Sequence, residues 1–248
     1  MSNTHTKERL QAFRIVDLPP EFYYIPNFIS LEEEASILQK IPSQRWTQLT
    51  HRRLQAHPST LTTNNTLLAS PLPIYLTNPI IHRFQDLGIF DQTPHHQPNH
   101  VLINEYKPGE GIMPHEDGCA YAPVVATVSL GGALCLDISS KPTSASDQAR
   151  AGLGKRHAVP TRILQEPRSL LITAGAAYGE LLHGVAAVEV DEDLRPETVA
   201  NWGLLGDADG MVRTGGRNVR STRVSLTYRD VLKVSSAASK VLGGLGKR

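Results

Sequence analysis

The sequence predicts one mainly β domain with flanking helices, an α+β chain whose strands form a closed or double-sheet architecture. Three observations support this fold class. The chain has 248 residues, of which 40% are hydrophobic, which is the size of one domain with an ordinary core. Two helical patterns precede residue 100. From there onward, apolar and polar residues alternate in short segments that glycines and prolines separate.

The first helix is expected after residues 13–29, which read as short extended segments broken by prolines. Ser30 and Glu33 form a capping box at its start, and Pro42 ends the pattern. Apolar residues recur at helical spacing, so one face should be buried. The members of this face are Leu31, Ala35, Leu38 and Ile41.

The second helix is expected in the segment NPIIHRFQDLG. Asn78 is its predicted N-cap, Pro79 lies in its first turn, and Gly88 terminates it. Its apolar face consists of Ile81, Phe84 and Leu87.

Seven β-strands are expected in the second part of the chain, from the period of two and from turn residues. They are residues 100–106, 123–130, 133–138, 161–165, 168–173, 178–188 and 222–228. Two stretches rich in Gly, Pro and polar residues interrupt them, residues 139–160 and 191–218. We interpret these stretches as insertions on a β scaffold rather than linkers between domains.

Residues 13–232 are expected to form the domain, between a flexible N-terminus at residues 1–12 and a flexible tail at residues 233–248. No apolar leader and no bilayer-spanning apolar run occurs. The two cysteines, Cys119 and Cys135, are too few for a disulfide framework and are expected to face the core. We therefore expect a soluble intracellular protein, located in the cytoplasm and nucleus.

The stretch GIMPHEDGCAY, residues 111–121, places His115 and Asp117 two positions apart. In a strand such residues project from the same face, so the two side chains could bind one cation. A solvated loop could carry the same pair, and the motif alone does not distinguish the two.

His183 offers a third ligand, in the apolar segment GELLHGV. A buried imidazole in such a segment needs a hydrogen bond or a metal. Two histidines and one carboxylate on one side of a cation form the facial triad of non-heme Fe(II) oxygenases, which leaves positions open for substrate and dioxygen. A structural zinc site would instead use four ligands, often cysteines, and neither CxxC nor HExxH occurs.

The segment RVSLTYR alternates between polar and apolar side chains. The polar face is formed by Arg223, Ser225, Thr227 and Arg229. Its two guanidinium groups suit a dicarboxylate, unless the strand is a sheet edge whose arginines are solvated. Asn104 and Tyr106 are also two apart, and we expect them to line the same pocket from a neighbouring strand.

Several motifs together resemble the AlkB-like Fe(II)/2-oxoglutarate-dependent dioxygenases in order and spacing. They are NEY at 104–106, HED at 115–117, LHG at 182–184 and RVSLTYR at 223–229. Three longer segments are similar, more narrowly, to the sixth branch of the animal AlkB homologues. They are WTQLTHRRLQ at 46–55, PNHVLINEYKPGEGIMPHEDG at 98–118 and EPRSLL at 166–171.

The resemblance implies a double-stranded β-helix jelly roll. It implies that His115, Asp117 and His183 hold Fe(II), and that Arg223 binds the distal carboxylate of 2-oxoglutarate. The other positions that contact this cosubstrate in the family correspond to Asn104, Tyr106, Ser225 and Arg229. A departure from compact members is the long interval between His183 and Arg223, which contains the 191–218 insertion.

The implied reaction is oxidative demethylation of N-methylated RNA or DNA, with 2-oxoglutarate and dioxygen as cosubstrates, giving succinate, carbon dioxide and formaldehyde. One alternative is a hydroxylase or demethylase of the same superfamily that acts on a protein or small molecule, which a net charge of +1 would suit. Another is a jelly-roll binding module without catalysis. No membrane partner is expected.

A local basic run gives the sequence evidence for nucleic acid, because residues 211–229 contain five arginines and no acidic residue. Arg213, Arg217 and Arg220 are predicted to contact phosphate, or else to be solvated loop arginines. A set of aromatic and histidine side chains is interpreted as packing or surface residues rather than site residues. They are Trp46, His95, His96, Tyr121 and Tyr178.

Overall fold

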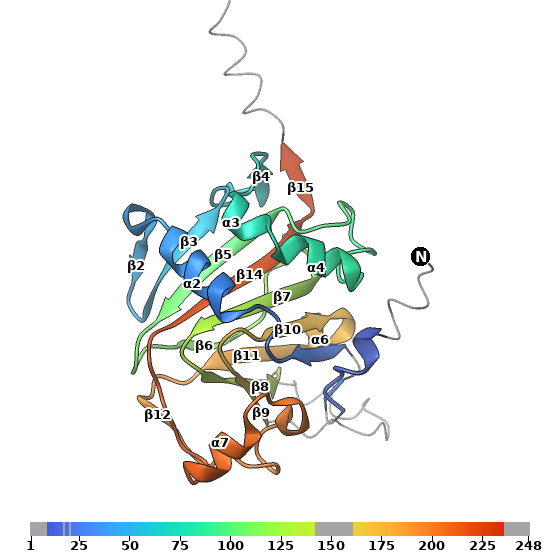
Figure 1. Cartoon of the computed structure of the whole chain (residues 1–248). Coiled ribbons are helices and arrows are strands. Elements are labelled where there is room, and N and C mark those ends of the chain that lie inside the picture. The colour runs from blue at the N-terminus through green and yellow to red at the C-terminus, as the bar shows by residue number, and fades with distance from the viewer. Residues whose placement is uncertain (1–8, 17, 20, 142–160, 236–248) are drawn as a thin grey trace, which may run out of the picture.

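The computed structural model describes residues 9–16, 18–19, 21–141 and 161–235. Eight of its strands form the core of two facing sheets (Figure 1). The four in the large sheet are β5 (His100–Tyr106), β7 (Tyr121–Gly131), β10 (Leu170–Ala174) and β14 (Arg223–Val231). The four in the small sheet are β6 (Ile112–His115), β8 (Leu134–Ser140), β9 (Thr161–Gln165) and β11 (Leu181–Val185).

The order of these strands defines the fold. They run β10-β7-β14-β5 in the large sheet and β6-β11-β8-β9 in the small one, and all pairs are antiparallel. Along the chain, the connections cross repeatedly from one sheet to the other. This is the eight-stranded jelly roll, so the predicted fold class is confirmed.

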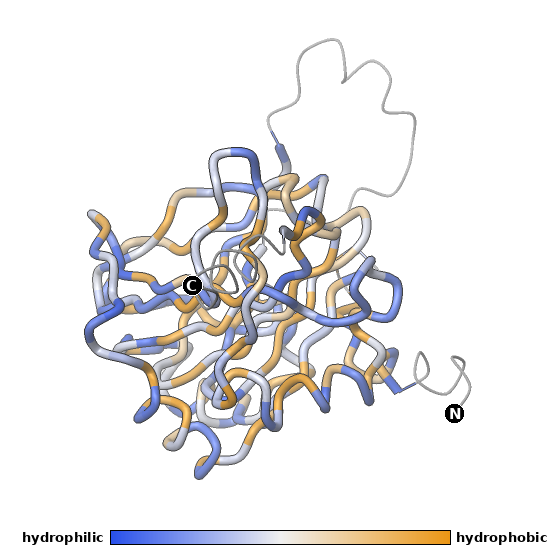
Figure 2. Tube along the Cα trace, turned by 90° about the horizontal axis from the view of Figure 1, so that it is seen from above, coloured by the Kyte–Doolittle hydropathy of each residue, from blue (hydrophilic) through white to orange (hydrophobic). Residues whose placement is uncertain are grey.

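Further strands extend this core. The large sheet continues with β1 (Phe22–Ile25) beside β10, and with β3 (Arg52–His57) and β2 (Thr47–Leu49) beside β5. Two short pairs lie outside it, β12 (Val190–Asp191) with β13 (Asn218–Val219), and β4 (Thr66–Leu68) with β15 (Lys233–Ser235). Apolar and polar residues follow one another at short intervals along the chain trace (Figure 2).

Three helices cover the outer face of the large sheet (Figure 1). They are α2 (Leu31–Lys40), α3 (Ile74–Thr77) and α4 (Ile80–Asp86). Ile37, Leu76 and Phe84 from these helices pack in one apolar cluster with Leu226 and Tyr228 of β14. The remaining helical elements are η1 (Ser43–Arg45), α6 (Gly175–Glu180), η2 (Trp202–Leu204) and α7 (Ala208–Arg213).

The capping box of α2 is present, but its predicted buried face is wrong in part. Leu31 is 63% exposed and Ala35 is exposed, whereas Glu34 and Ile37 are buried. Glu34 can be buried because its carboxylate accepts hydrogen bonds from the backbone of Gly131 at 2.8 Å and from an arginine, Arg168, at 3.1 Å. With these partners, Glu34 and Ile37 are buried on this helix in place of the predicted Leu31 and Ala35.

The start of α4 also differs from the prediction. Pro79 is the N-cap, with no side-chain hydrogen bond, and Asn78 instead ends α3. Gly88 does follow the helix with a positive φ of 63°.

The expected strand at 178–188 divides into two elements. Its first residues belong to α6 and only Leu181–Val185 form a strand, β11. Of the other six predicted strands, 100–106 and 161–165 have the predicted bounds, and the remaining four are present with shifted ends. The pattern of 178–188 did not reveal α6, because a helix this short has no complete apolar face.

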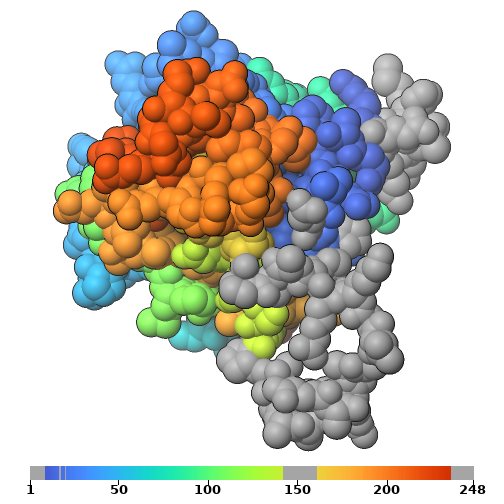
Figure 3. All heavy atoms as spheres, turned by 90° about the horizontal axis from the view of Figure 1, so that it is seen from below, coloured from blue at the N-terminus to red at the C-terminus, as the bar shows by residue number. Residues whose placement is uncertain are grey.

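The 191–218 stretch is folded rather than a loose loop. It contains η2 and α7, and Leu194 and Val199 pack in a small cluster with Cys135 of β8. Figure 3 shows these residues, in orange, gathered over one face of the molecule. Most of the other predicted insertion, residues 142–160, lies outside the described residues, and β8 extends to Ser140.

Structure continues past both expected limits of the domain. Residues 9–11 form one helical turn, and β15 pairs with β4 although it follows residue 232. Cys135 is buried as predicted, but Cys119 is exposed, so that part of the prediction is wrong. Among the described helices, none has the length and apolar character to cross a membrane.

Candidate active site

The central strand β14 separates the helices from a pocket between the two sheets. Its apolar side chains pack under the helices. Its polar side chains line the pocket, and they are Arg223, Ser225, Thr227 and Arg229. Arg223 is 3% and Arg229 7% exposed, so the alternative of a solvated sheet edge is wrong.

Strand β5 brings the predicted polar pair beside β14. Asn104 is paired in register with Ser225, and Tyr106 with Arg223. Both β5 side chains line the same pocket. Burial raises the pKa of Tyr106, while nearby arginines, Arg52 foremost, act in the opposite direction. The phenol therefore stays a neutral hydrogen-bonding group near several cations.

His115 and His183 meet across the small sheet. They are register partners on β6 and β11, and their ring centroids lie 4.4 Å apart. Nδ1 of His115 lies 2.9 Å from the carbonyl oxygen of Met113. Because a carbonyl can only accept, Nδ1 must donate this bond, so Nε2 is the ring nitrogen that could face a metal. Burial lowers the pKa of His183 to about 4, so this imidazole is neutral at neutral pH.

Asp117 lines the pocket, but it does not lie on the strand of His115 as the sequence predicts. Strand β6 ends at His115, so Asp117 lies in the irregular segment that follows and not on the same strand. Its carboxylate forms an ion pair with Arg229, and both side chains are buried. In the described part of the chain, no three His, Cys, Asp or Glu side chains form a closely gathered metal cluster.

The residues of the pocket nevertheless fit Fe(II) by their chemistry. Two imidazoles and one carboxylate are the donor types of the facial triad. The carbonyl of Met113 holds the His115 ring as outer partners of metal-binding histidines do. Arg229 holds the carboxylate of Asp117 in the same pocket.

Arg223 is a buried cation without a carboxylate partner among the described residues. Its Nη2 donates to Ser129 Oγ and to Gln165 Oε1, each at 2.9 Å, and its Nε has no partner. Burial lowers its pKa to about 10, so the guanidinium remains charged at neutral pH. A buried charge without a counterion is costly, and a carboxylate from a bound dicarboxylate would satisfy it.

Arg229 has a similar spare donor at the other end of the strand. Its Nη2 contacts Asp117, its Nε is buried without a partner, and its guanidinium lies 5.0 Å from the ring centroid of Tyr121. The pocket thus holds two unsatisfied guanidinium donors on one strand face, which is the arrangement that an anion with two carboxylates requires.

Three side chains that the sequence prediction did not assign also line this pocket. Arg52 on β3 donates from Nε to Asn104 Oδ1 at 3.2 Å, and Gln165 on β9 contacts Arg223. Tyr178 on α6 donates to the carbonyl oxygen of Gly118 at 3.1 Å, so it contacts the segment that carries Asp117. The motif THRRLQ contained Arg52, but only the pairing of β3 with β5 places it in the pocket.

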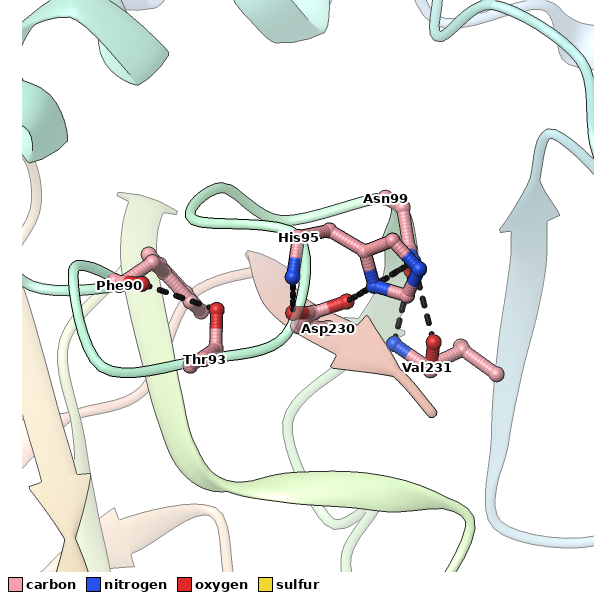
Figure 4. Close-up of polar contacts among 6 residues, drawn as sticks. All are labelled: Phe90, Thr93, His95, Asn99, Asp230 and Val231. Carbon is pink, nitrogen blue, oxygen red and sulfur yellow. Dashed lines mark hydrogen bonds and ion pairs between the residues drawn. The ribbon is translucent and has the colours of Figure 1, made fainter. Parts of the chain in front are cut away.

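The loop before β5 is fixed to the end of β14 by a buried carboxylate (Figure 4). Asp230 accepts from the backbone N of His95 at 3.0 Å, from its Nδ1 at 2.5 Å, and from Asn99 Nδ2 at 2.9 Å. Asn99 also exchanges hydrogen bonds with the backbone of Val231. These contacts hold the strand immediately beyond Arg229.

The predicted phosphate-binding arginines lie elsewhere and have acidic partners. Arg220 is buried in an ion pair with Asp191, so the prediction of a phosphate contact fails for it. Arg213 and Arg217 are exposed and pair with acidic residues of the same stretch, Asp207 and Glu192. The run that looks purely basic in sequence is therefore largely neutralised in space.

The family model that matches this chain is the 2OG-Fe(II) oxygenase superfamily, over residues 68–229. The chain belongs to this superfamily. It is therefore a dioxygenase, with Fe(II) as its metal and with 2-oxoglutarate and dioxygen as cosubstrates. The matched residues contain the strands β5 to β11 and nearly all of β14.

Individual relatives of this dioxygenase include a zebrafish (Danio rerio) protein named probable RNA/DNA demethylase ALKBH6. It is 39% identical over 92% of this chain and 93% of its own length. An uncharacterized protein of Acanthamoeba polyphaga mimivirus, L905, is 28% identical over 86% of this chain and 85% of its own. A Xenopus tropicalis tRNA (carboxymethyluridine(34)-5-O)-methyltransferase, alkbh8, is 27% identical over 86% of this chain, which spans 32% of that protein.

Among solved structures, OsALKBH1 is 14% identical with a TM-score of 0.49, over 86% of this chain and 99% of that one. A Pseudomonas putida prolyl-4-hydroxylase is 13% identical with a TM-score of 0.44, over 85% and 92% of the two chains.

Proposed function

We propose that this dioxygenase oxidatively demethylates N-methylated nucleic acid, RNA or DNA, in the cytoplasm and nucleus. The observation that carries the proposal is its 39% identity, over nearly its full length, to a protein named as a probable RNA/DNA demethylase. The reaction consumes one 2-oxoglutarate and one dioxygen for each methyl group. It yields succinate, carbon dioxide, formaldehyde and the demethylated base.

His115, Asp117 and His183 are the proposed Fe(II) ligands. With 2-oxoglutarate bound, the iron supplies the oxidising equivalent that hydroxylates the methyl carbon, after which the carbon–nitrogen bond breaks. Burial keeps the imidazole of His183 neutral, and the Met113 carbonyl fixes the ring of His115 through its Nδ1. Arg229 orients the carboxylate of Asp117 through their ion pair.

The proposed 2-oxoglutarate site consists of Asn104, Tyr106, Arg223, Ser225 and Arg229. Arg223 offers a buried charge for the distal carboxylate, and Tyr106 and Asn104 offer neutral hydrogen-bonding groups beside it. Much of the rest of the wall is apolar and would exclude water from the reacting groups. Its members include Phe22, Leu136, Ile138 and Leu171.

The charges that line the pocket also favour a polyanionic substrate. Arg52, Arg223 and Arg229 carry three positive charges there, against the one negative charge of Asp117. Fe(II) and the dianion of 2-oxoglutarate together add no net charge. An excess of two positive charges then remains, and Arg52 is the cation without an acidic partner in the proposed assignment. A phosphate beside the target base would satisfy it.

A panel of methylated substrates tests the proposal. The protein with Fe(II) and 2-oxoglutarate is mixed with N-methylated RNA and DNA oligonucleotides, and formaldehyde and succinate are measured. We expect release of both products with an oligonucleotide and not with its unmethylated copy. Release only with methylated peptides or small molecules would favour the alternative hydroxylase or demethylase. An absence of succinate with every substrate and without substrate would favour a binding module.

A further inference from the structure

A buried amide group holds the guanidinium of Arg223 in place. Oε1 of Gln165 accepts a hydrogen bond from Arg223 Nη2 at 2.9 Å, and Ser129 Oγ lies 2.9 Å from the same nitrogen. Ser129 also lies 3.4 Å from Gln165 Oε1. Gln165 is 2% exposed and Ser129 is fully buried. One end of the guanidinium is therefore fixed by two neutral groups, while Nε remains without a partner.

The positive charge of Arg223 is not compensated, because its two hydrogen-bond partners, Ser129 and Gln165, are neutral. The charged or titratable groups that act on it are Tyr106, Arg220 and Tyr24, none of which is a carboxylate. Glutamate in place of glutamine at position 165 would bring a carboxylate to the same distance. The identity of this one side chain thus decides whether Arg223 forms an internal ion pair or an anion site.

The neighbouring residue shows how the strand keeps a carboxylate out of the pocket. Glu166 follows Gln165 and directs its carboxylate to the backbone N of Gly206 and Asp207, each at 2.9 Å, and to the hydroxyl of Tyr24 at 2.8 Å. Gln165 lines the pocket and Glu166 does not. Alternation along the chain therefore directs the amide toward Arg223 and the acid away from it.

The 191–218 stretch fixes the strand that carries Gln165. Asn201 from this stretch is buried, and its side-chain amide binds both backbone groups of Leu164, the N at 2.9 Å and the O at 2.8 Å. On the other side, Gln165 is paired with Leu134 of β8. The amide at position 165 is thus held from both edges of its strand.

We infer that Gln165 is a positioning residue for 2-oxoglutarate: with Ser129 it orients Arg223 toward the distal carboxylate while leaving the guanidinium charge uncompensated. Gln165 itself does not touch the cosubstrate. It acts through Arg223, and the 191–218 stretch supports it through Asn201.

The test is the dissociation constant of 2-oxoglutarate, measured by calorimetry with Mn(II) in place of Fe(II) and without any nucleic acid. In Gln165→Glu, the new carboxylate pairs with Arg223 and competes with the ligand, so we expect at least a tenfold weaker affinity. The thermal midpoint should stay level or rise, because a buried cation gains a counterion. In Gln165→Leu, we expect a smaller loss of affinity and a lower thermal midpoint, because Arg223 loses an acceptor.

A matched control is Gln55→Glu, which makes the same change at another glutamine, 1% exposed, that contacts Pro42 and His57 away from the pocket. It should lower the thermal midpoint and leave 2-oxoglutarate affinity unchanged. Wild-type affinity in Gln165→Glu would overturn the inference, as would an equal loss of affinity in the Gln55→Glu control. Because no methylated substrate enters the measurement, the result does not depend on whether nucleic acid is the substrate.

Discussion

Arg52 and Arg53 are adjacent in sequence but lie in opposite electrostatic environments. Arg53 lies 2.7 Å from the carboxylate of Glu105, and its guanidinium lies 4.5 Å from the ring centroid of Trp46. Arg52 projects from the other face of β3 into the pocket, where the one partner of its Nε among the described residues is the neutral amide of Asn104. The charge of Arg53 is compensated, whereas that of Arg52 is available to an anion.

This difference predicts that Arg52→Gln weakens oligonucleotide binding and Arg53→Gln does not. Loss of one phosphate contact should flatten the slope of log affinity against log salt by about 0.7–0.9. The measurement is oligonucleotide affinity between about 50 and 200 mM salt for wild type and both variants. Equal slopes for Arg52→Gln and wild type, together with weaker 2-oxoglutarate binding, would assign Arg52 to the cosubstrate instead.

The proposed metal ligands predict a loss of metal binding without a loss of fold. His115→Ala removes one of two imidazoles and should abolish tight Mn(II) or Fe(II) binding, while the circular dichroism spectrum is retained. Asp117→Asn should do the same, and its amide oxygen still accepts from Arg229. Electron paramagnetic resonance titration with Mn(II) measures the effect. Wild-type metal affinity in either variant would remove that residue from the ligand set.

Arg223→Lys predicts a weaker response to 2-oxoglutarate. A lysine ammonium cannot reach Ser129, Gln165 and a carboxylate with the planar geometry of a guanidinium. A charge-assisted hydrogen bond is worth about 1.5–3 kcal/mol, so the KM for 2-oxoglutarate should rise roughly tenfold or more. The KM for the methylated substrate should change little. A shift confined to the methylated substrate would contradict the assignment.

Patterns with a period of two gave reliable predictions where one face of a strand is buried among apolar groups. Strand β14 is the best case, because Leu226 and Tyr228 face the helices while Arg223 and Ser225 face the pocket. The sequence could therefore identify which side chains share the site. It could not establish that Asp117 lies beyond the end of β6, since the end of a strand depends on its pairing with β11.

The failed predictions involve buried charges with distant partners. Glu34 is buried because Gly131 and Arg168 satisfy its carboxylate, and Arg220 is buried because Asp191 neutralises it. Hydrophobic periodicity counts both residues as exposed, because it contains no information on residues far along the chain. Arg52 and Gln165 escaped prediction for the same reason, as only sheet pairing brings them to the pocket.

The hydrogen bonds of Asp230 at the end of β14 should contribute to the stability of the fold. Asp230→Ala would leave three donors, two on His95 and one on Asn99, without their buried acceptor. His95 is exposed to water and Asn99 still donates to Val231, so the free energy of unfolding should fall by about 1–3 kcal/mol. Urea unfolding measures it. Gln97→Ala, at an exposed position in the same loop, is the control and should change stability by less than about 0.5 kcal/mol.

Because Arg220 is buried in an ion pair with Asp191, we expect its substitution to lower the stability of the fold strongly and to leave nucleic-acid binding unchanged. Its guanidinium donates to Asp191 from Nε at 2.9 Å and from Nη2 at 2.5 Å, and to the carbonyl oxygen of Ala186 at 2.7 Å. Arg220→Ala leaves the carboxylate of Asp191 buried without a cation, so the free energy of unfolding should fall by about 3–5 kcal/mol.

The double variant Arg220→Met with Asp191→Leu removes both charges and should be markedly more stable than Arg220→Ala, because no uncompensated charge stays buried. Arg217→Ala breaks an exposed pair with Glu192 and should cost about 1 kcal/mol or less. Urea unfolding gives the three stabilities, and the salt dependence of oligonucleotide binding is measured on the same proteins. A near-wild-type stability for Arg220→Ala with a flatter salt slope would mean that Arg220 leaves Asp191 to contact phosphate, as the basic run in the sequence first indicated.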